Sequence, residues 1–157
     1  MKVQRNKSTE AGMTLLELII ATSILLILAT AALPTVKVLM IRPKEAELRR
    51  ELREMRDAID RYKDVADRNL VRAEVGSEGY PLDFDALVKG VEYGSGTGQK
   101  LRFLRRIPVD PMTGKAEWNT QSVQDDPDST SGSGNNIFDV HSKSQGTALD
   151  GTKYANW

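Results

Sequence analysis

The residue with the clearest chemical consequence in this chain is Glu17, the only charged residue between Met13 and Leu33. An ionised carboxylate at the centre of a membrane costs at least ~2.5–3.5 kcal/mol, so such residues are usually retained where they find a partner. We therefore expect Glu17 to pair with another group when its helix packs. The alternative is a glutamate near the start of the helix that faces lipid headgroups and has no partner.

Few other residues offer catalytic chemistry. The sequence has no cysteine and a single histidine, His141, which leaves no thiol nucleophile or thiolate metal site and makes a Ser–His or multi-histidine zinc site hard to build. The 22 basic and 22 acidic side chains balance, so composition does not indicate a nucleic acid partner. The glycines of residues 94–98 lack the ending of a phosphate-binding loop. We expect a protein that is not an enzyme.

The segment that carries Glu17 is predicted to cross a membrane. An apolar helix needs about 20 residues to span the hydrocarbon core, and Met13–Leu33 meets that length. The basic leader over residues 1–12 favours a cytoplasmic N-terminus. A secretory signal cut after Ala31 is the alternative, because Ala29-Thr30-Ala31 fits such a cleavage site. The early carboxylate and the continuing apolar pattern favour a helix that is retained.

Beyond the apolar run, the sequence predicts an amphipathic continuation of the same helix. Its apolar residues recur at steps of four and three, which places them on one face of a helix, and charges fill the other face. Pro34 and Pro43 are expected to kink the helix, or in the case of Pro43 to start a new segment. We expect a nearly continuous helix over 14–69, with a transmembrane half at 13–41 and an amphipathic half at 42–69. The residues of the apolar face are Leu48, Leu52, Met55, Ile59, Tyr62 and Ala66.

Residues 70–157 are predicted to form a small head. Asp83–Val88 is long enough for one or two helical turns, and residues 70–100 otherwise read as a connecting region. Lys115–Thr120 and Asn136–His141 alternate apolar and polar residues and predict two antiparallel strands, joined by a polar loop. The predicted fold class is α+β, with a long N-terminal helix packed on a small antiparallel sheet.

The start of the apolar run resembles a known processing signal. Gly12-Met13-Thr14-Leu15-Leu16-Glu17 is similar to the class III signal of type IV pilins and type II secretion pseudopilins. In that family a membrane-embedded aspartyl peptidase cuts after the glycine and methylates the new N-terminus. The resemblance implies a cut between Gly12 and Met13, loss of residues 1–12, N-methylation of Met13 and an assembly role for Glu17. The new amine would lie one helical turn from Glu17, available within the chain or to Glu17 of a neighbouring chain.

Two segments of the head resemble the major pseudopilins. One is Ile107-Pro108-Val109-Asp110-Pro111, followed by a glycine and an aromatic strand, and the other is Leu149-Asp150-Gly151 with Asn156-Trp157. In that family the second segment lies in a C-terminal loop that often binds calcium. The resemblance implies calcium as a candidate cofactor, and Asp150 is the residue that matches a ligand position. Calcium takes six to eight oxygen ligands, and the second acid of the family's loop is missing here, where Thr152, Lys153 and Tyr154 follow Gly151. The positive charge of Lys153 also disfavours a cation nearby.

The resemblance implies a structural subunit of a type II secretion pseudopilus with a pilin-like fold. The chain would span the bacterial inner membrane once, with a cytoplasmic N-terminus and a periplasmic head. Expected partners are further copies in a helical filament, the prepilin peptidase, minor pseudopilins, the inner-membrane secretion platform and lipid. Two alternatives stay open. One is a subunit of a type IV pilus or of another pilin-like filament, and the other is a membrane-tethered periplasmic binding domain that does not polymerise.

Overall fold

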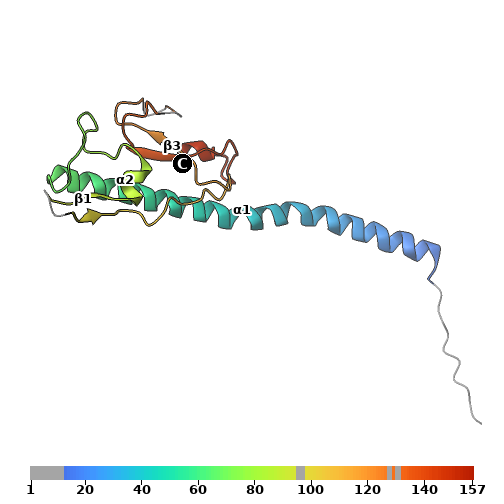
Figure 1. Cartoon of the computed structure of the whole chain (residues 1–157). Helices are drawn as coiled ribbons and strands as arrows, with labels where there is room; N and C mark the ends of the chain where they lie inside the picture. The colour runs from blue at the N-terminus through green and yellow to red at the C-terminus, as the bar shows by residue number, and fades with distance from the viewer. Residues whose placement is uncertain (1–12, 95–97, 127–128, 130–131) are drawn as a thin grey trace, which may run out of the picture. The chain divides into compact units, whose positions relative to one another are not determined.

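The computed structural model describes residues 13–94, 98–126, 129 and 132–157, with the backbone alone for residues 31–37 (Figure 1). The predicted α+β class is confirmed, because one long helix is followed by two small antiparallel sheets. The chain divides into two compact units, Met1–Leu39 and Met40–Trp157.

Helix α1 runs from Leu15 to Asp67, close to the predicted range. Thr14 precedes it in the position of an N-cap, since its Oγ1 accepts the Glu17 backbone N–H at 3.2 Å. The helix continues through both prolines, so Pro43 does not start a new segment. It ends in a Schellman motif, in which Asn69 adopts a positive φ of 57° and the Leu70 N–H donates to the Val65 carbonyl.

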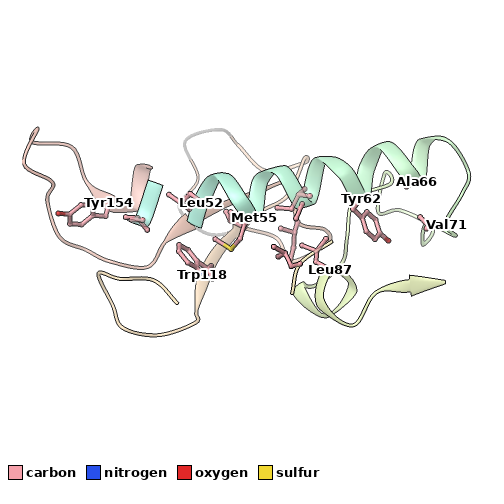
Figure 2. Close-up of a cluster of buried hydrophobic side chains, with 14 of the residues drawn as sticks. Leu52, Met55, Tyr62, Ala66, Val71, Leu87, Trp118 and Tyr154 are labelled. Carbon is pink, nitrogen blue, oxygen red and sulfur yellow. The ribbon is translucent and has the colours of Figure 1, made fainter. Parts of the chain in front are cut away.

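The hydrophobic core of the second unit lies along one face of α1 (Figure 2). Every residue of the predicted apolar face is buried, with at most 7% of its surface exposed. Leu87 and Trp118 from the head pack in the same cluster as Met55 and Tyr62 of the helix. The spacing of apolar residues therefore predicted both the helix and the face that the head covers.

Strands β3 (Trp118–Gln121) and β4 (Asp139–Ser142) form the antiparallel pair that the sequence predicted, with Trp118 opposite Ser142. Both strands lie nearer the C-terminus than expected. β3 begins late because residues 110–115 form a closed turn, in which the Gly114 N–H donates to the Asp110 carbonyl and the Asp110 N–H to the Lys115 carbonyl. Lys115, the predicted first residue of the strand, is used by that turn, and the strand begins at Trp118.

A second pair of strands was not predicted. Strands β1 (Val91–Glu92) and β2 (Lys100–Leu101) pair antiparallel inside the region expected to be a connection. Each is two residues long, too short to show an alternating pattern. Glycine is required at position 90 before β1, because φ is 81° and a Cβ would lie 2.6 Å from the Leu101 carbonyl oxygen.

The predicted short helix is confirmed as α2, which spans Phe84–Val88. Asp83 is its N-cap, with Oδ1 accepting the Ala86 N–H at 2.8 Å. Leu87 is the residue of this helix that enters the core. A 3₁₀ helix, η1 (Tyr154–Asn156), lies near the end of the chain and contacts β4.

Replacement of Leu52 by alanine should lower the free energy of unfolding of the second unit by about 2–5 kcal/mol, because a buried side chain is lost and a cavity remains. Urea unfolding of the full chain in detergent measures this change. Val75→Ala is the matched control: Val75 is fully exposed, so the change should stay within about 0.5 kcal/mol. Equal losses in the two variants would contradict the assigned core.

Candidate functional site

The predicted assembly residue, Glu17, lies in the first turn of α1. Its side chain is exposed, as is that of Met13, which is 64% accessible. The Glu17 N–H is capped by Thr14, so this sequence also serves to start the helix. Gly12 lies outside the described residues. The proposed cut, the methylation of Met13 and the assembly role of Glu17 therefore stay predictions.

The helix surface around Glu17, from Leu15 to Leu28, is apolar and exposed. Its large apolar side chains up to Leu28 have between 51% (Ile19) and 79% (Leu15) of their surface accessible. The hydroxyls on this surface donate to carbonyls of their own helix, as Thr22 does to Leu18 at 2.8 Å and Ser23 to Ile19 at 2.7 Å. The surface therefore offers a partner apolar groups and one carboxylate.

No helix within the described part of the chain is long and apolar enough to cross a membrane. The transmembrane span predicted over Met13–Leu33 is not confirmed.

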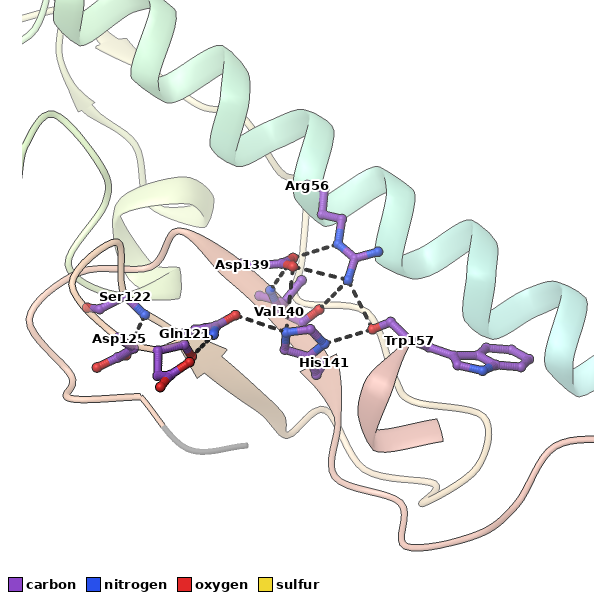
Figure 3. Close-up of polar contacts among 9 residues, drawn as sticks. Arg56, Gln121, Ser122, Asp125, Asp139, Val140, His141 and Trp157 are labelled. Carbon is purple, nitrogen blue, oxygen red and sulfur yellow. Dashed lines mark hydrogen bonds and ion pairs between the residues drawn. The ribbon is translucent and has the colours of Figure 1, made fainter. Parts of the chain in front are cut away.

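In the second unit, Arg56 of α1 connects the helix to β4 and to the last residue of the sequence (Figure 3). Its Nε donates to Asp139 Oδ1 at 2.6 Å, and its Nη2 donates to the backbone oxygens of Val140 and Trp157, both at 3.0 Å. Hydrogen bonds between charged groups are stronger than neutral ones, and the planar guanidinium fixes their directions. Arg56 thus holds three separate groups at one point on the helix.

His141 supports the same arrangement from β4. Its Nδ1 lies 2.9 Å from the Trp157 backbone oxygen, and its Nε2 lies 3.4 Å from Gln121 Oε1 (Figure 3). Asp139 Oδ2 is 3.6 Å from Nε2. These neighbours are acceptors, so the ring orients the end of the chain. They include no hydroxyl or thiol that the ring would activate as a nucleophile.

Glu45 fixes the C-terminal segment from one end of the apolar face. It is 7% exposed, and its Oε1 accepts the Leu149 N–H at 2.8 Å and the Tyr154 hydroxyl at 3.0 Å. Burial and the bond to Glu45 raise the pKa of Tyr154, which keeps the hydroxyl protonated as a donor. Sequence reasoning missed Glu45, although it stands three residues before Leu48 and so continues the apolar face.

Asp150, the predicted metal ligand, is held by its own loop. Its Oδ1 accepts the Thr152 hydroxyl at 2.6 Å and the Thr152 N–H at 2.9 Å, and its Oδ2 lies 3.5 Å from Arg49 Nη2. The hydroxyl bond, then the N–H bond and more weakly Arg49 lower the pKa of Asp150. Among the residues that the structure describes, no three histidine or acidic side chains gather where they could hold a metal ion. Calcium at Asp150 stays an untested prediction.

A family model described as the prokaryotic N-terminal methylation motif matches residues 7–33. This match supports a relation to type IV pilin-like proteins, and it covers Gly12, Met13 and Glu17 but none of the head. Such a motif implies processing by a prepilin peptidase and pilus-like assembly, and it suggests a membrane-anchored protein. No curated protein and no solved structure matches the chain.

Replacement of Arg56 by alanine should lower the free energy of unfolding by about 2 kcal/mol, because it removes charged hydrogen bonds to β4 and to Trp157. Arg56→Lys should recover only part of this loss, since a point charge cannot make the same forked contacts. Urea unfolding of the full chain in detergent measures both. Arg53→Ala is the control, because this arginine is exposed on the same helix, and a loss as large there would refute the role of Arg56.

Proposed function

We propose that this chain is a structural subunit of a type II secretion pseudopilus. Its helix would anchor it in the bacterial inner membrane after removal of residues 1–12, with the N-terminus on the cytoplasmic side and the head in the periplasm. Subunits would then polymerise into a filament that helps to export proteins across the outer membrane. The observation that carries the proposal is an exposed apolar helix surface that starts within a methylation motif.

Among the residues that the structure describes, none covers this exposed apolar surface. Burying one large aliphatic side chain is worth about 1.5–3 kcal/mol relative to leaving it in water, and the stretch from Leu15 to Leu28 carries many of them. Lipid would cover the surface before assembly, and helices of neighbouring subunits would cover it in a filament. The hydroxyls of Thr22 and Ser23 suit both, because their donors are already bonded to Leu18 and Ile19.

Glu17 gives such a filament its register. Within the described residues, the Glu17 carboxylate makes no hydrogen bond or ion pair. The bond to Thr14 uses the backbone N–H of Glu17 and leaves the carboxylate available to a partner. A carboxylate in the first turn is favoured by the positive end of the helix dipole. The amine that processing would create at Met13 offers it a charged partner, either in its own chain or in a neighbour. An unpaired Glu17 among apolar helices is costly, so a subunit out of register is disfavoured.

Two features of the head support a type II secretion system over a type IV pilus. The segment Ile107–Pro111, which resembles the major pseudopilins, is built into the fold: Asp110 is fully buried and accepts the Ser142 hydroxyl at 2.6 Å. The Pro108 carbonyl accepts the Trp118 indole N–H at 3.0 Å. The sequence also has no cysteine for the terminal disulfide loop of many pilins, and the C-terminal segment is instead bonded to Glu45 and Arg56.

The proposal predicts that Glu17→Ala leaves membrane insertion and processing intact but abolishes most assembly. Expression with a complete secretion system and crosslinking through two cysteines, placed at the exposed positions Leu16 and Leu26, should give a ladder of oligomers for the otherwise unchanged chain, because two thiols in each subunit can link it to two neighbours. In Glu17→Ala the yield of crosslinked oligomers and the amount of secreted protein should both fall by at least about tenfold. The loss of a charge pair in apolar surroundings should cost more than about 1.4 kcal/mol of association free energy, and that energy corresponds to a factor of ten.

Thr14→Ala is the matched control for this experiment. It removes the cap at the same helix start but keeps the carboxylate, so its ladder should stay close to that of the parent chain. A normal ladder in Glu17→Ala, or an equal loss in Thr14→Ala, would contradict the pairing role. A parent chain that forms no ladder would instead indicate a tethered domain that does not polymerise.

A further inference from the structure

The C-terminal segment, residues 146–157, is bonded to α1 by three side chains that share one helix face. Positions 45, 49 and 56 lie within about 40° of one another around the helix. Glu45 accepts bonds from Leu149 and Tyr154, and Arg56 donates to the Trp157 backbone oxygen. Arg49 lies between them in sequence and faces Asp150, the residue at which the resemblance implied calcium.

The groups around Asp150 do not fit a calcium ion. Calcium requires six to eight oxygen ligands, whereas Asp150 is surrounded by donors of hydrogen bonds. The hydroxyl and N–H of Thr152 both point at Oδ1, and the Arg49 guanidinium lies 3.5 Å from Oδ2. The buried carboxylate near the segment, Glu45, already accepts two bonds through its Oε1. An ion at Asp150 would have to displace Arg49 and break the turn to Thr152.

Arg49 is held in this position by a second contact. Its guanidinium carbon lies 4.0 Å from the centre of the Trp157 ring, the geometry of a cation–π interaction. Trp157 is itself fixed, because its indole N–H donates to Thr152 Oγ1 at 2.7 Å and its ring meets Tyr154 edge to face. Arg49, Asp150, Thr152 and Trp157 thus form a closed set of contacts with a positive charge in the middle.

The loop between these contacts is closed by its own backbone. The Ala148 N–H donates to the Thr152 carbonyl at 2.8 Å, and the Gly151 N–H donates to the Ala148 carbonyl at 3.0 Å. Gly151 has a φ of 88°, a conformation that glycine adopts without strain. These backbone hydrogen bonds already close the turn, so the turn does not need a bound ion to fix its conformation.

We infer that Arg49 takes the place of a bound cation in this segment: its guanidinium holds Asp150 on one side and the Trp157 ring on the other, so the segment folds without calcium. The positive charge comes from α1 itself, which ties the loop to the helix. This inference concerns the second unit alone and does not depend on the proposed filament.

Thermal unfolding of the full chain in detergent, followed by tryptophan fluorescence, tests the inference directly. The midpoint should be the same in excess calcium chloride and in excess chelator. Arg49→Ala should lower the midpoint by about 2–4 °C in both media, because it removes the cation–π contact and the pair with Asp150.

Arg50→Ala is the matched control, because this neighbouring arginine is exposed and pairs with Glu47 and Glu51 of its own helix rather than with the C-terminal segment. Its midpoint should stay near that of the parent chain. A rise in the parent's midpoint with calcium would overturn the inference whether or not the variants fold. A loss in Arg49→Ala no larger than that in Arg50→Ala would overturn it as well.

Discussion

The packing of the head onto one apolar face of α1 is the constraint on which the rest of the second unit depends. The strands of the head are two to four residues long, and pairs of such strands are not stable alone in water. They are held because Trp118, Val140 and Leu87 bury their side chains against the helix. The polar contacts of Glu45, Arg49 and Arg56 follow the same face and fasten β4 and the C-terminal segment to it.

The same helix presents two kinds of surface, and this difference links the fold to the proposed function. From Leu48 to Ala66 the apolar residues form one stripe that the chain itself covers. From Leu15 to Leu28 they surround the helix and are exposed, with Glu17 as the one charge among them. Soluble monomers rarely expose an apolar surface of this size, because its contact with water is unfavourable. A subunit that moves from lipid into a bundle of identical helices would keep this surface out of water in both places.

The sequence predicted features that repeat and missed contacts between distant residues. A period of three and four residues was enough to predict α1 and its buried face, and alternation was enough to predict β3 and β4. The contacts of Arg56 with Asp139 and Trp157 join residues far apart in the chain, and no local pattern marks them. The resemblance suggested calcium at Asp150 because this residue matches a ligand position in the C-terminal loop of the major pseudopilins. It could not reveal that Arg49, from a different element, occupies the other side of that carboxylate.

Retention of the apolar helix in the mature protein is the central requirement of the proposed function, and the intact mass of that protein tests it most directly. The chain would be isolated from the membranes of bacteria that carry a prepilin peptidase and measured by mass spectrometry. We expect the loss of residues 1–12 and the addition of one methyl group at Met13. A mass that corresponds to a cut after Ala31 would show that the helix is a discarded signal and would contradict the account.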